Sequence, residues 1–226
     1  MAATDFDLIV FDWDGTVVDS AGLIAQCILD AADAAGAPRP SLDDARHVIG
    51  LGLDDALAYC FPGVAHGVLL DVVAHYKRIF VGRDAGGVIQ PFSGARDLLG
   101  WLSIRGSGLA VATGKSRAGL DRQFGTTGLG PLFHGSRCAD ETHPKPHPAM
   151  LLELMDEFSV SPSRTLMIGD TSHDRLMAES AGTAFVGVTF GAHPREALHG
   201  PATRILCDDY GQLDRWLRTH EPVAAL

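Results

Sequence analysis

Positive charge is scarce in this sequence. Lysine and arginine number 18 against 28 aspartate and glutamate residues, which gives a formal net charge of -10 over 226 residues. A general nucleic-acid-binding or anionic-membrane-binding surface needs clustered lysine and arginine, so the charge argues against both kinds of partner. We therefore expect any phosphate-bearing partner to be a small molecule that is bound locally.

Long apolar runs and paired cysteines are also missing. No stretch approaches the roughly 18 uninterrupted apolar residues that indicate a membrane-spanning helix. The N-terminal residues lack the basic segment that begins a secretory signal. The four cysteines are far apart and include no Cys-x-x-Cys pair, which favours reduced thiols. We expect a cytoplasmic protein.

Short apolar runs recur along the chain, and polar residues or glycine follow each of them. The runs are LIVF at 8–11, LAVA at 109–112, TLMI at 165–168, AFVGVTF at 184–190 and RILC at 204–207. Because runs that are apolar on both faces suit a parallel sheet covered by helices, we interpret them as strands. Helical patterns lie between them, at 93–106, 116–128, 147–160, 172–182 and 211–220. The alternation predicts an α/β fold with a doubly wound parallel sheet.

This alternation fails between residues 18 and 88. Three helical patterns follow one another there without a strand, at 22–36, 41–60 and 68–80. We therefore predict an all-helical cap domain, residues 18–88, inserted into a core domain formed by residues 1–17 and 89–226. Because the insertion follows the first strand, we expect the cap to lie over the carboxyl edge of the sheet.

Two acidic motifs follow predicted strands. Asp12 and Asp14 come at the end of the first strand, where open α/β sheets place their ligands, and Gly15 permits a sharp turn there. Asp170 and Asp174, in GDTSHD, follow another apolar run. Carboxylates gathered at one sheet edge need a counter-charge, and oxygen ligands suit Mg²⁺. Turn and helix-cap roles are the alternatives, and a magnesium site is favoured if the two strands are neighbours.

Two further motifs could hold an anion. Thr113 and Gly114 follow LAVA and precede a predicted helix, whose first backbone N–H groups can bind a phosphate. The segment is not a P-loop, because Leu109 stands where that motif requires glycine. Lys145 lies between prolines that keep the backbone extended, and a lysine presented in this way can contact a phosphate. The alternatives are a helix cap and an ordinary surface lysine.

In this order, the motifs resemble the haloacid dehalogenase superfamily of phosphoryl-transfer enzymes. The resemblance rests on DWDGT as the first motif, Thr113 as the second, Lys145 in KPHP as the third and GDTSHD as the fourth. It covers essentially the whole chain, and MAESAGTAFVGVTFGAHPREAL is similar to the phosphoglycolate phosphatase branch. The resemblance implies a Rossmann-like core, a helical cap and an Mg²⁺-dependent phosphatase for a small phosphorylated metabolite such as 2-phosphoglycolate.

The resemblance also implies roles for the motif residues. Asp12 is expected to attack phosphorus and form an aspartyl-phosphate, and Asp14 to serve as general acid and then base. Thr113, Gly114 and Lys145 are expected to hold the phosphoryl oxygens. The implied metal set contains Asp12, the backbone carbonyl of Asp14, Asp170 and Asp174, the last of which places a water ligand or Lys145.

Substrate identity is expected to depend on the cap. Arg46 and His47 are our candidates there for binding a carboxylate or a second polar group, and solvated helix faces are the alternative. A sugar-phosphate mutase of the β-phosphoglucomutase type uses the same four motifs and stays an alternative function, as does a catalytically silent phosphate-ligand-binding protein. Dehalogenase chemistry is disfavoured because Asp14 stands two residues beyond the nucleophile. The sequence does not indicate an oligomeric state.

Overall fold

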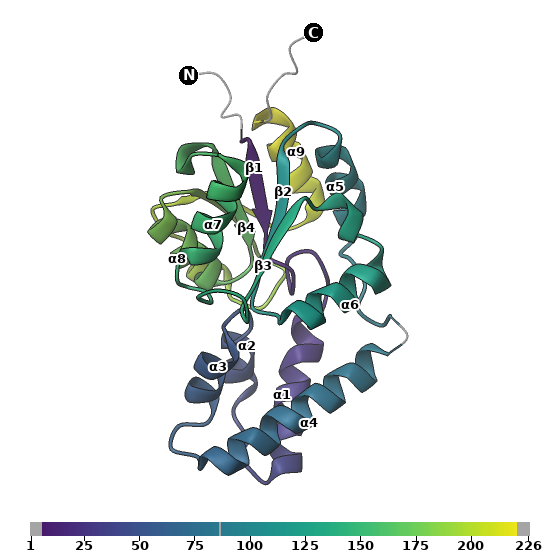
Figure 1. Ribbon diagram of the computed structural model, residues 1–226, viewed down its shortest axis with the longest axis vertical. Helices are drawn as coiled ribbons and strands as arrows, with labels where there is room; N and C mark the ends of the chain where they lie inside the picture. The colour runs from purple at the N-terminus through teal and green to yellow at the C-terminus, as the bar shows by residue number, and fades with distance from the viewer. Residues whose placement is uncertain (1–5, 86, 221–226) are drawn as a thin grey trace.

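A parallel sheet forms the upper body of the molecule in the computed structural model, which describes residues 6–85 and 87–220 (Figure 1). Within these residues the strands are β1 (Leu8–Phe11), β2 (Gly108–Thr113), β3 (Gly135–Cys138), β4 (Thr165–Gly169), β5 (Ala184–Val188) and β6 (Thr203–Cys207). Their order across the sheet is β3-β2-β1-β4-β5-β6, and all neighbours are parallel. The predicted fold class is confirmed.

Helices cover both faces of the sheet. Leu8 and Val10 of β1 pack against α7 (Ala149–Phe158) and α8 (Ser172–Ala181). Ile9 and Phe11 point to the other face, in a cluster with residues of three more helices, which are α5 (Ala95–Ser103), α6 (Arg117–Thr127) and α9 (Tyr210–His220). Successive side chains of a strand alternate between faces, so a strand covered on both sides is apolar throughout. This is why LIVF shows no polar alternation.

The edge strand β3 is missing from the sequence prediction. Its residues, GSRC, are mostly half-buried, and it pairs with β2 alone. An edge strand does not have to be apolar on both faces, so β3 lacks the signal by which the other strands were found. Three short 3₁₀ turns complete the core, at Gly130–Leu132, Pro162–Arg164 and Arg195–Leu198.

Four helices form the lower body, next to the carboxyl ends of the strands (Figure 1). They are α1 (Ala21–Ala35), α2 (Leu42–His47), α3 (Leu53–Cys60) and α4 (His66–Asp84). They enclose a small apolar core of their own, which includes Ala32, Val48, Phe61 and Val72. An inserted helical cap is therefore present, and the boundaries at residues 17/18 and 88/89 stay a prediction.

The helix expected over 41–60 is two helices, α2 and α3. Ser41 begins α2 with a capping box, in which its hydroxyl accepts from the backbone N–H of Asp44 at 3.0 Å. α2 ends at His47, and Gly50 in the turn that follows has a φ of 93°, a left-handed conformation that a continuous helix does not allow. At the other end of the cap, α4 continues to Asp84, four residues beyond the helical pattern at 68–80.

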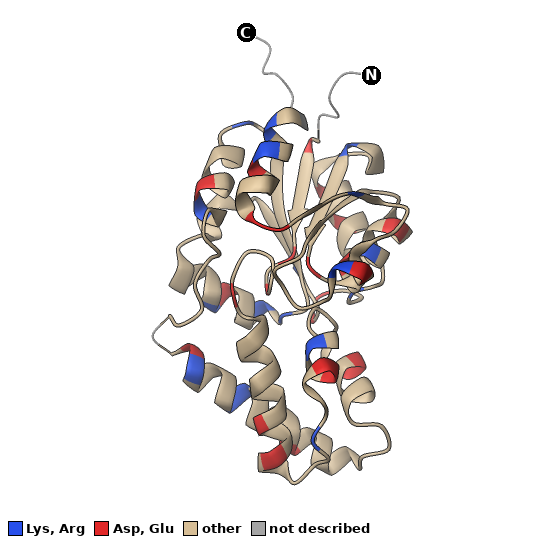
Figure 2. Ribbon diagram, turned by 180° about the vertical axis from the view of Figure 1, so that it is seen from behind, with Lys and Arg blue, Asp and Glu red and all other residues tan. Residues whose placement is uncertain are grey.

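Charged residues of both signs are distributed over the helices. In the view of Figure 2, Lys and Arg positions are interspersed with Asp and Glu positions, and acidic positions also lie where the strands end above the cap. Within the described part of the chain, no helix combines the length and the apolar character needed to cross a bilayer.

Candidate active site

Strand order brings the two acidic motifs together. β1 and β4 are neighbours, with Phe11 in register with Ile168, and the backbone N–H of Asp12 donates to the carbonyl of Ile168 at 2.8 Å. Asp12 and Asp170 therefore follow adjacent strands at one edge of the sheet. The condition under which the sequence favoured a magnesium site is met.

Lys145 lies between two carboxylates beneath this edge. Its Nζ is 2.7 Å from Asp12 Oδ1 and 2.7 Å from Asp174 Oδ1, and all three side chains are buried. Burial alone would lower the pKa of Lys145, but the two carboxylates raise it above its ordinary value. Burial raises the pKa of Asp12, and the Lys145 ammonium opposes that rise. Lys145 is thus a fixed cation inside the site and not a surface lysine.

Asp170 is held by two donors from different segments. Thr16 Oγ1 donates to its Oδ1 at 2.6 Å, and the backbone N–H of Ala192 donates to Oδ2 at 2.7 Å. A Cβ atom at Gly15 or at Gly191 would overlap this carboxylate, so the glycines allow the backbone to pass next to it. Burial, followed by the nearby Asp174, raises the pKa of Asp170 to about 7. The backbone at Gly15 and Gly191 thus packs directly against the buried Asp170 carboxylate.

Asp174 has a double role. Its Oδ2 accepts from the hydroxyl of Thr171 at 2.7 Å and from the Thr171 backbone N–H at 3.0 Å, which completes a capping box at the start of α8. Its Oδ1 faces Lys145. The helix-cap interpretation of GDTSHD is therefore confirmed for Thr171, which is the N-cap residue, while Asp174 belongs both to the capping box and to the carboxylate cluster.

The arrangement of oxygen atoms fits a hard cation. Asp12, Asp170 and Asp174 each offer a carboxylate oxygen within 4.8 Å of the other two. Asp12 Oδ2 is buried and has no hydrogen-bond partner among the residues that the structure describes. A buried carboxylate oxygen without a partner carries a large cost unless a cation or another donor meets it. An all-oxygen donor set of this kind suits Mg²⁺.

The side chain of Asp14 points away from this cluster. Its Oδ1 accepts from Ser20 Oγ at 2.6 Å, and its Oδ2 is 2.8 Å from Lys115 Nζ. The Lys115 ammonium also lies over the ring of Phe80, 4.9 Å from the centroid, on the cap helix α4. The two carboxylates of the first motif thus have different partners. The side chain of Lys115, two residues after Thr113, is a site residue that the sequence prediction missed.

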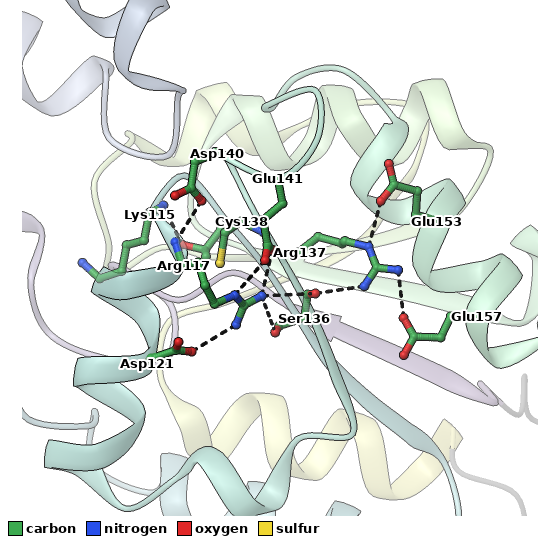
Figure 3. Close-up of polar contacts among 11 residues, drawn as sticks. Lys115, Arg117, Asp121, Ser136, Arg137, Cys138, Asp140, Glu141, Glu153 and Glu157 are labelled. Carbon is green, nitrogen blue, oxygen red and sulfur yellow. Dashed lines mark hydrogen bonds and ion pairs between the residues drawn. The ribbon is translucent and has the colours of Figure 1, made fainter.

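A network around Arg117 holds the neighbouring loops in place (Figure 3). The Arg117 guanidinium donates to both carboxylate oxygens of Glu141, at 2.9 and 2.8 Å. The backbone N–H of Arg117 donates to Asp140 Oδ1 at 2.8 Å. The backbone N–H of Ala139 donates to the carbonyl of Lys115 at 3.0 Å. These contacts join the loop after β2 to the loop after β3, which continues to Lys145. Two loops that carry site residues are therefore fixed relative to each other.

Gly114 is a point of close approach between the core and the cap. A Cβ atom there would lie 2.6 Å from the carbonyl oxygen of Gly50 and 2.8 Å from that of Leu51. Thr113 is buried, and its hydroxyl accepts from the backbone N–H of Lys115 at 3.2 Å. Ser116 caps α6. Thr113 is therefore free of the helix-cap role considered as its alternative.

A cavity of about 440 Å³ lies between the core and the cap. Its core side is lined by Asp12, Asp14, Thr113, Gly114 and Lys115. Its cap side is lined mainly by apolar residues of α1, α3 and α4. The carboxylates, the hydroxyl and the loop backbone thus meet at one end of this cavity.

Arg46 and His47, our candidates in the cap, are not among the residues that line this cavity, and their role in substrate binding stays a prediction. Arg46 is exposed, whereas the carbonyl of His47 accepts from Nε2 of His173 at 2.7 Å and from Nε2 of His193 at 3.0 Å. The last carbonyls of a helix have no partner within the helix, and two core histidines satisfy this one at the end of α2. His47 therefore joins the cap to the core instead of lining the cavity.

The comparison with protein families decides the affiliation of the chain. Residues 9–188 match the family model described as haloacid dehalogenase-like hydrolase. The chain belongs to this family. The resemblance that the four motifs indicated is confirmed, and so is the expectation of an enzyme.

Similar proteins carry related names. Over 211 residues the chain is 33% identical to a protein of Dickeya dadantii (strain 3937) named "Probable phosphatase IndB". The aligned region covers 91% of this chain and 91% of that protein. The chain is 28% identical to a phosphoglycolate phosphatase of Pseudomonas putida (strain KT2440), with 89% of this chain and 76% of that protein covered. A crystal structure titled as a predicted phosphoglycolate phosphatase from Haemophilus somnus 129pt shares 25% identity, with a TM-score of 0.78 over 93% of this chain and 97% of that one.

Proposed function

We propose that this protein is an Mg²⁺-dependent phosphatase that hydrolyses small phosphomonoesters through an aspartyl-phosphate on Asp12. Family membership and relatives named as phosphatases support this activity. The observation that carries it is the buried Asp12 Oδ2, which has no hydrogen-bond partner among the described residues, on a residue that lines the cavity. A carboxylate oxygen with this environment is available both to a cation and to a phosphorus atom.

In the proposed reaction, Asp12 displaces the alcohol of the ester from phosphorus. Water then displaces the Asp12 carboxylate from the same phosphorus, which releases phosphate and restores the free carboxylate. Asp14 lines the cavity and would transfer a proton to the leaving oxygen, then accept one from the attacking water. Lys145 and Thr113 would stabilise negative charge on the phosphoryl oxygens, because a fixed cation and a positioned hydroxyl need little reorganisation during the reaction.

The residues that would hold Mg²⁺ are Asp12, Asp170 and the backbone carbonyl of Asp14, with Asp174 orienting Lys145 and a water ligand. When bound, Mg²⁺ neutralises charge on the phosphoryl oxygens and fixes them relative to the nucleophile. Asp174 already keeps Lys145 in place through the 2.7 Å ion pair and is itself held by Thr171. The proposed substrate is a small phosphorylated metabolite, and the names of the relatives make 2-phosphoglycolate the first compound to test.

The cysteines support a reducing compartment. Cys27, Cys60, Cys138 and Cys207 are all free and buried. Because disulfides are rare in reducing compartments and no bridge connects these four, we propose a cytoplasmic location.

Release of p-nitrophenol from p-nitrophenyl phosphate tests the proposed activity. We expect release that depends on added Mg²⁺ and that Asp12→Asn abolishes, because the amide is neither a nucleophile of comparable strength nor a charged ligand. Asp54→Asn, at an exposed position of α3, is the matched control and should keep wild-type activity. Equal release by wild type and Asp12→Asn would remove Asp12 as nucleophile, and no Mg²⁺-dependent release by the wild type would remove the phosphatase proposal.

A further inference from the structure

We infer that the substrate carries a bulky, uncharged and largely apolar leaving group, with a flat ring system as its best-fitting form. This inference rests on the proposed phosphatase function and narrows its substrate class. It starts from the cavity of about 440 Å³, whose core end holds Asp12, Asp14 and Thr113. If phosphorus lies at that end, the leaving group must extend toward the cap.

The cap end of the cavity is apolar. The cap helices α1, α3 and α4 and the segments that join the cap helices contribute to this lining. Representative residues are Ile24, Ile28, Leu57, Phe61, Tyr76 and Phe80. Apolar surface that a ligand covers stabilises the complex roughly in proportion to its area. A leaving group with only a carboxylate on a single methylene, as in 2-phosphoglycolate, would leave most of this wall uncovered.

Positive charge at the wall is poorly placed to receive a carboxylate. Among the described residues that line the cavity, the cations are Lys77, Lys115 and Arg122. Lys77 and Arg122 are exposed side chains, and Arg122 also faces the buried Asp84 at 3.8 Å. Lys115 is half-buried and already paired with Asp14 at 2.8 Å. A substrate carboxylate deep inside the cap would therefore lose water without meeting a buried, unpaired cation, because Lys77 lies at an exposed position, and this disfavours a charged leaving group.

Aromatic residues in the wall favour a flat ring. Tyr76 and Phe80 stack with ring centroids 5.8 Å apart and an interplanar angle of 23°, and the Phe80 ring also underlies the Lys115 ammonium. Stacked and edge-to-face contacts with such rings add to the gain from area alone. Burial and the nearby Asp14 raise the pKa of Tyr76, so its hydroxyl stays protonated and can donate one hydrogen bond to a polar edge of the ligand.

Three esters of primary alcohols test the inference, because they share the type of leaving oxygen and differ in the group attached to it. They are ethyl phosphate, 2-phosphoglycolate and naphthylmethyl phosphate. We expect kcat/KM for naphthylmethyl phosphate to exceed that for each of the others by about tenfold or more, as expected when a pocket gains apolar contacts. A higher kcat/KM for 2-phosphoglycolate than for naphthylmethyl phosphate would overturn the inference.

A pair of substitutions locates the effect. Ala56→Phe, in the cavity wall on α3, should lower kcat/KM for naphthylmethyl phosphate about tenfold and leave ethyl phosphate nearly unchanged. Ala74→Phe adds the same group at an exposed position of α4 outside the lining and should affect neither ester. An equal loss for both esters in Ala56→Phe would contradict a leaving-group pocket at this wall. The ester comparison on the wild type does not depend on how either variant folds.

Binding separates this inference from the proposed function. Naphthylmethylphosphonate and ethylphosphonate have no ester bond to cleave, and their affinities can be measured by calorimetry with the whole chain and Mg²⁺. Tighter binding of the naphthylmethyl compound by about tenfold supports the apolar pocket even if no ester is hydrolysed, in which case the phosphatase proposal alone fails. Equal affinities would overturn the inference even if every ester is hydrolysed.

Discussion

At the residue scale, the missing side chain of Gly114 allows the core backbone to lie directly against the cap backbone. Because a Cβ atom there would lie 2.6 Å from the carbonyl oxygen of Gly50, Gly114→Ala must displace one of the two backbones. We expect kcat/KM to fall by about 10- to 100-fold, as for displacements of about 1 Å at reacting groups. Steady-state kinetics measure this fall in kcat/KM. Urea denaturation measures the stability of the variant, which we expect to stay largely folded.

The control for this change is Gly125→Ala. Gly125 is exposed on α6, and a Cβ atom there meets nothing within 4 Å, so activity should stay at the wild-type level and helix stability should rise slightly. Wild-type activity in Gly114→Ala would show that the cap tolerates a shift at this contact, contrary to our account.

At the residue scale, the sequence predicts positions on strands better than pairings between loops. Asp12 and Asp170 were placed correctly because each directly follows a buried strand, and the sheet brings the ends of neighbouring strands together. The contact between Asp14 and Lys115 and the position of His47 depend on how loops and cap helices pack in the tertiary structure. No local sequence pattern indicates that packing. Trp13, between the two aspartates of the first motif, packs against Phe124 and Phe133.

At the element scale, a buried polar chain connects the first motif to the end of the cap. Trp13 Nε1 donates to Gln123 Oε1 at 2.5 Å, and Gln123 Nε2 donates to Asp84 Oδ2 at 3.4 Å. β1, α6 and α4 are thereby linked. We expect Gln123→Ala to lower the free energy of unfolding by about 1–3 kcal/mol, because the indole N–H stays buried without an acceptor. Urea denaturation measures this loss.

Gln26→Ala is the matched control for that experiment. Gln26 is exposed on α1 and donates to Asp30 one helical turn away. Such pairs contribute about 0.2–0.5 kcal/mol, so the control should change stability by no more than this. A similar loss in both variants would mean that the chain from Trp13 to Asp84 contributes nothing specific.

The ion pair between Arg117 and Glu141 gives a pH-dependent prediction for the loops in Figure 3. The hydrogen bond from Arg117 holds the pKa of Glu141 below its ordinary value. A lowered pKa in the folded state stabilises the protein above the unfolded-state pKa, about 4.3, and this gain is lost as pH falls through the folded-state value. Because both side chains are about one-third exposed, we expect less than about 1 kcal/mol.

Glu141→Gln tests that gain. The difference in unfolding free energy between wild type and variant should be present at neutral pH and vanish in acid. Glu196→Gln, at an exposed position, should show no such dependence. A difference that persists unchanged into acid would exclude the charge of Glu141 as its source.

The sequence predicts a strand well when the strand is buried on both faces, because burial then requires an apolar run. Strands covered on both faces, such as β1 and β4, leave apolar runs, whereas the edge strand β3 is half-buried and leaves none. The pattern over 41–60 continued in phase across Gly50 although the helix does not. The turn there brings the cap backbone onto Gly114, a tertiary contact that helical periodicity cannot indicate.

At the scale of the whole molecule, the proposed Mg²⁺ site predicts that metal binding stabilises the folded chain. Mg²⁺ that binds the folded chain alone should raise the free energy of unfolding by about 2.7 kcal/mol when its concentration is 100 times Kd. Asp170→Asn should remove most of this gain, because the amide has no negative charge with which to bind the cation. The control Asp54→Asn should keep the full gain. Thermal unfolding with and without Mg²⁺ measures both. An equal gain in wild type and Asp170→Asn would place the metal elsewhere.

The central claim is that Asp12 carries the phosphoryl group during turnover. The most direct measurement mixes the enzyme with substrate and Mg²⁺, stops the reaction in acid within a single turnover and maps the peptides by mass spectrometry. We predict the added mass of one phosphoryl group on the peptide that contains Asp12, its removal by hydroxylamine and its absence in Asp12→Asn. A wild-type enzyme that turns over while this peptide stays unmodified, or while another peptide carries the group, would contradict the account.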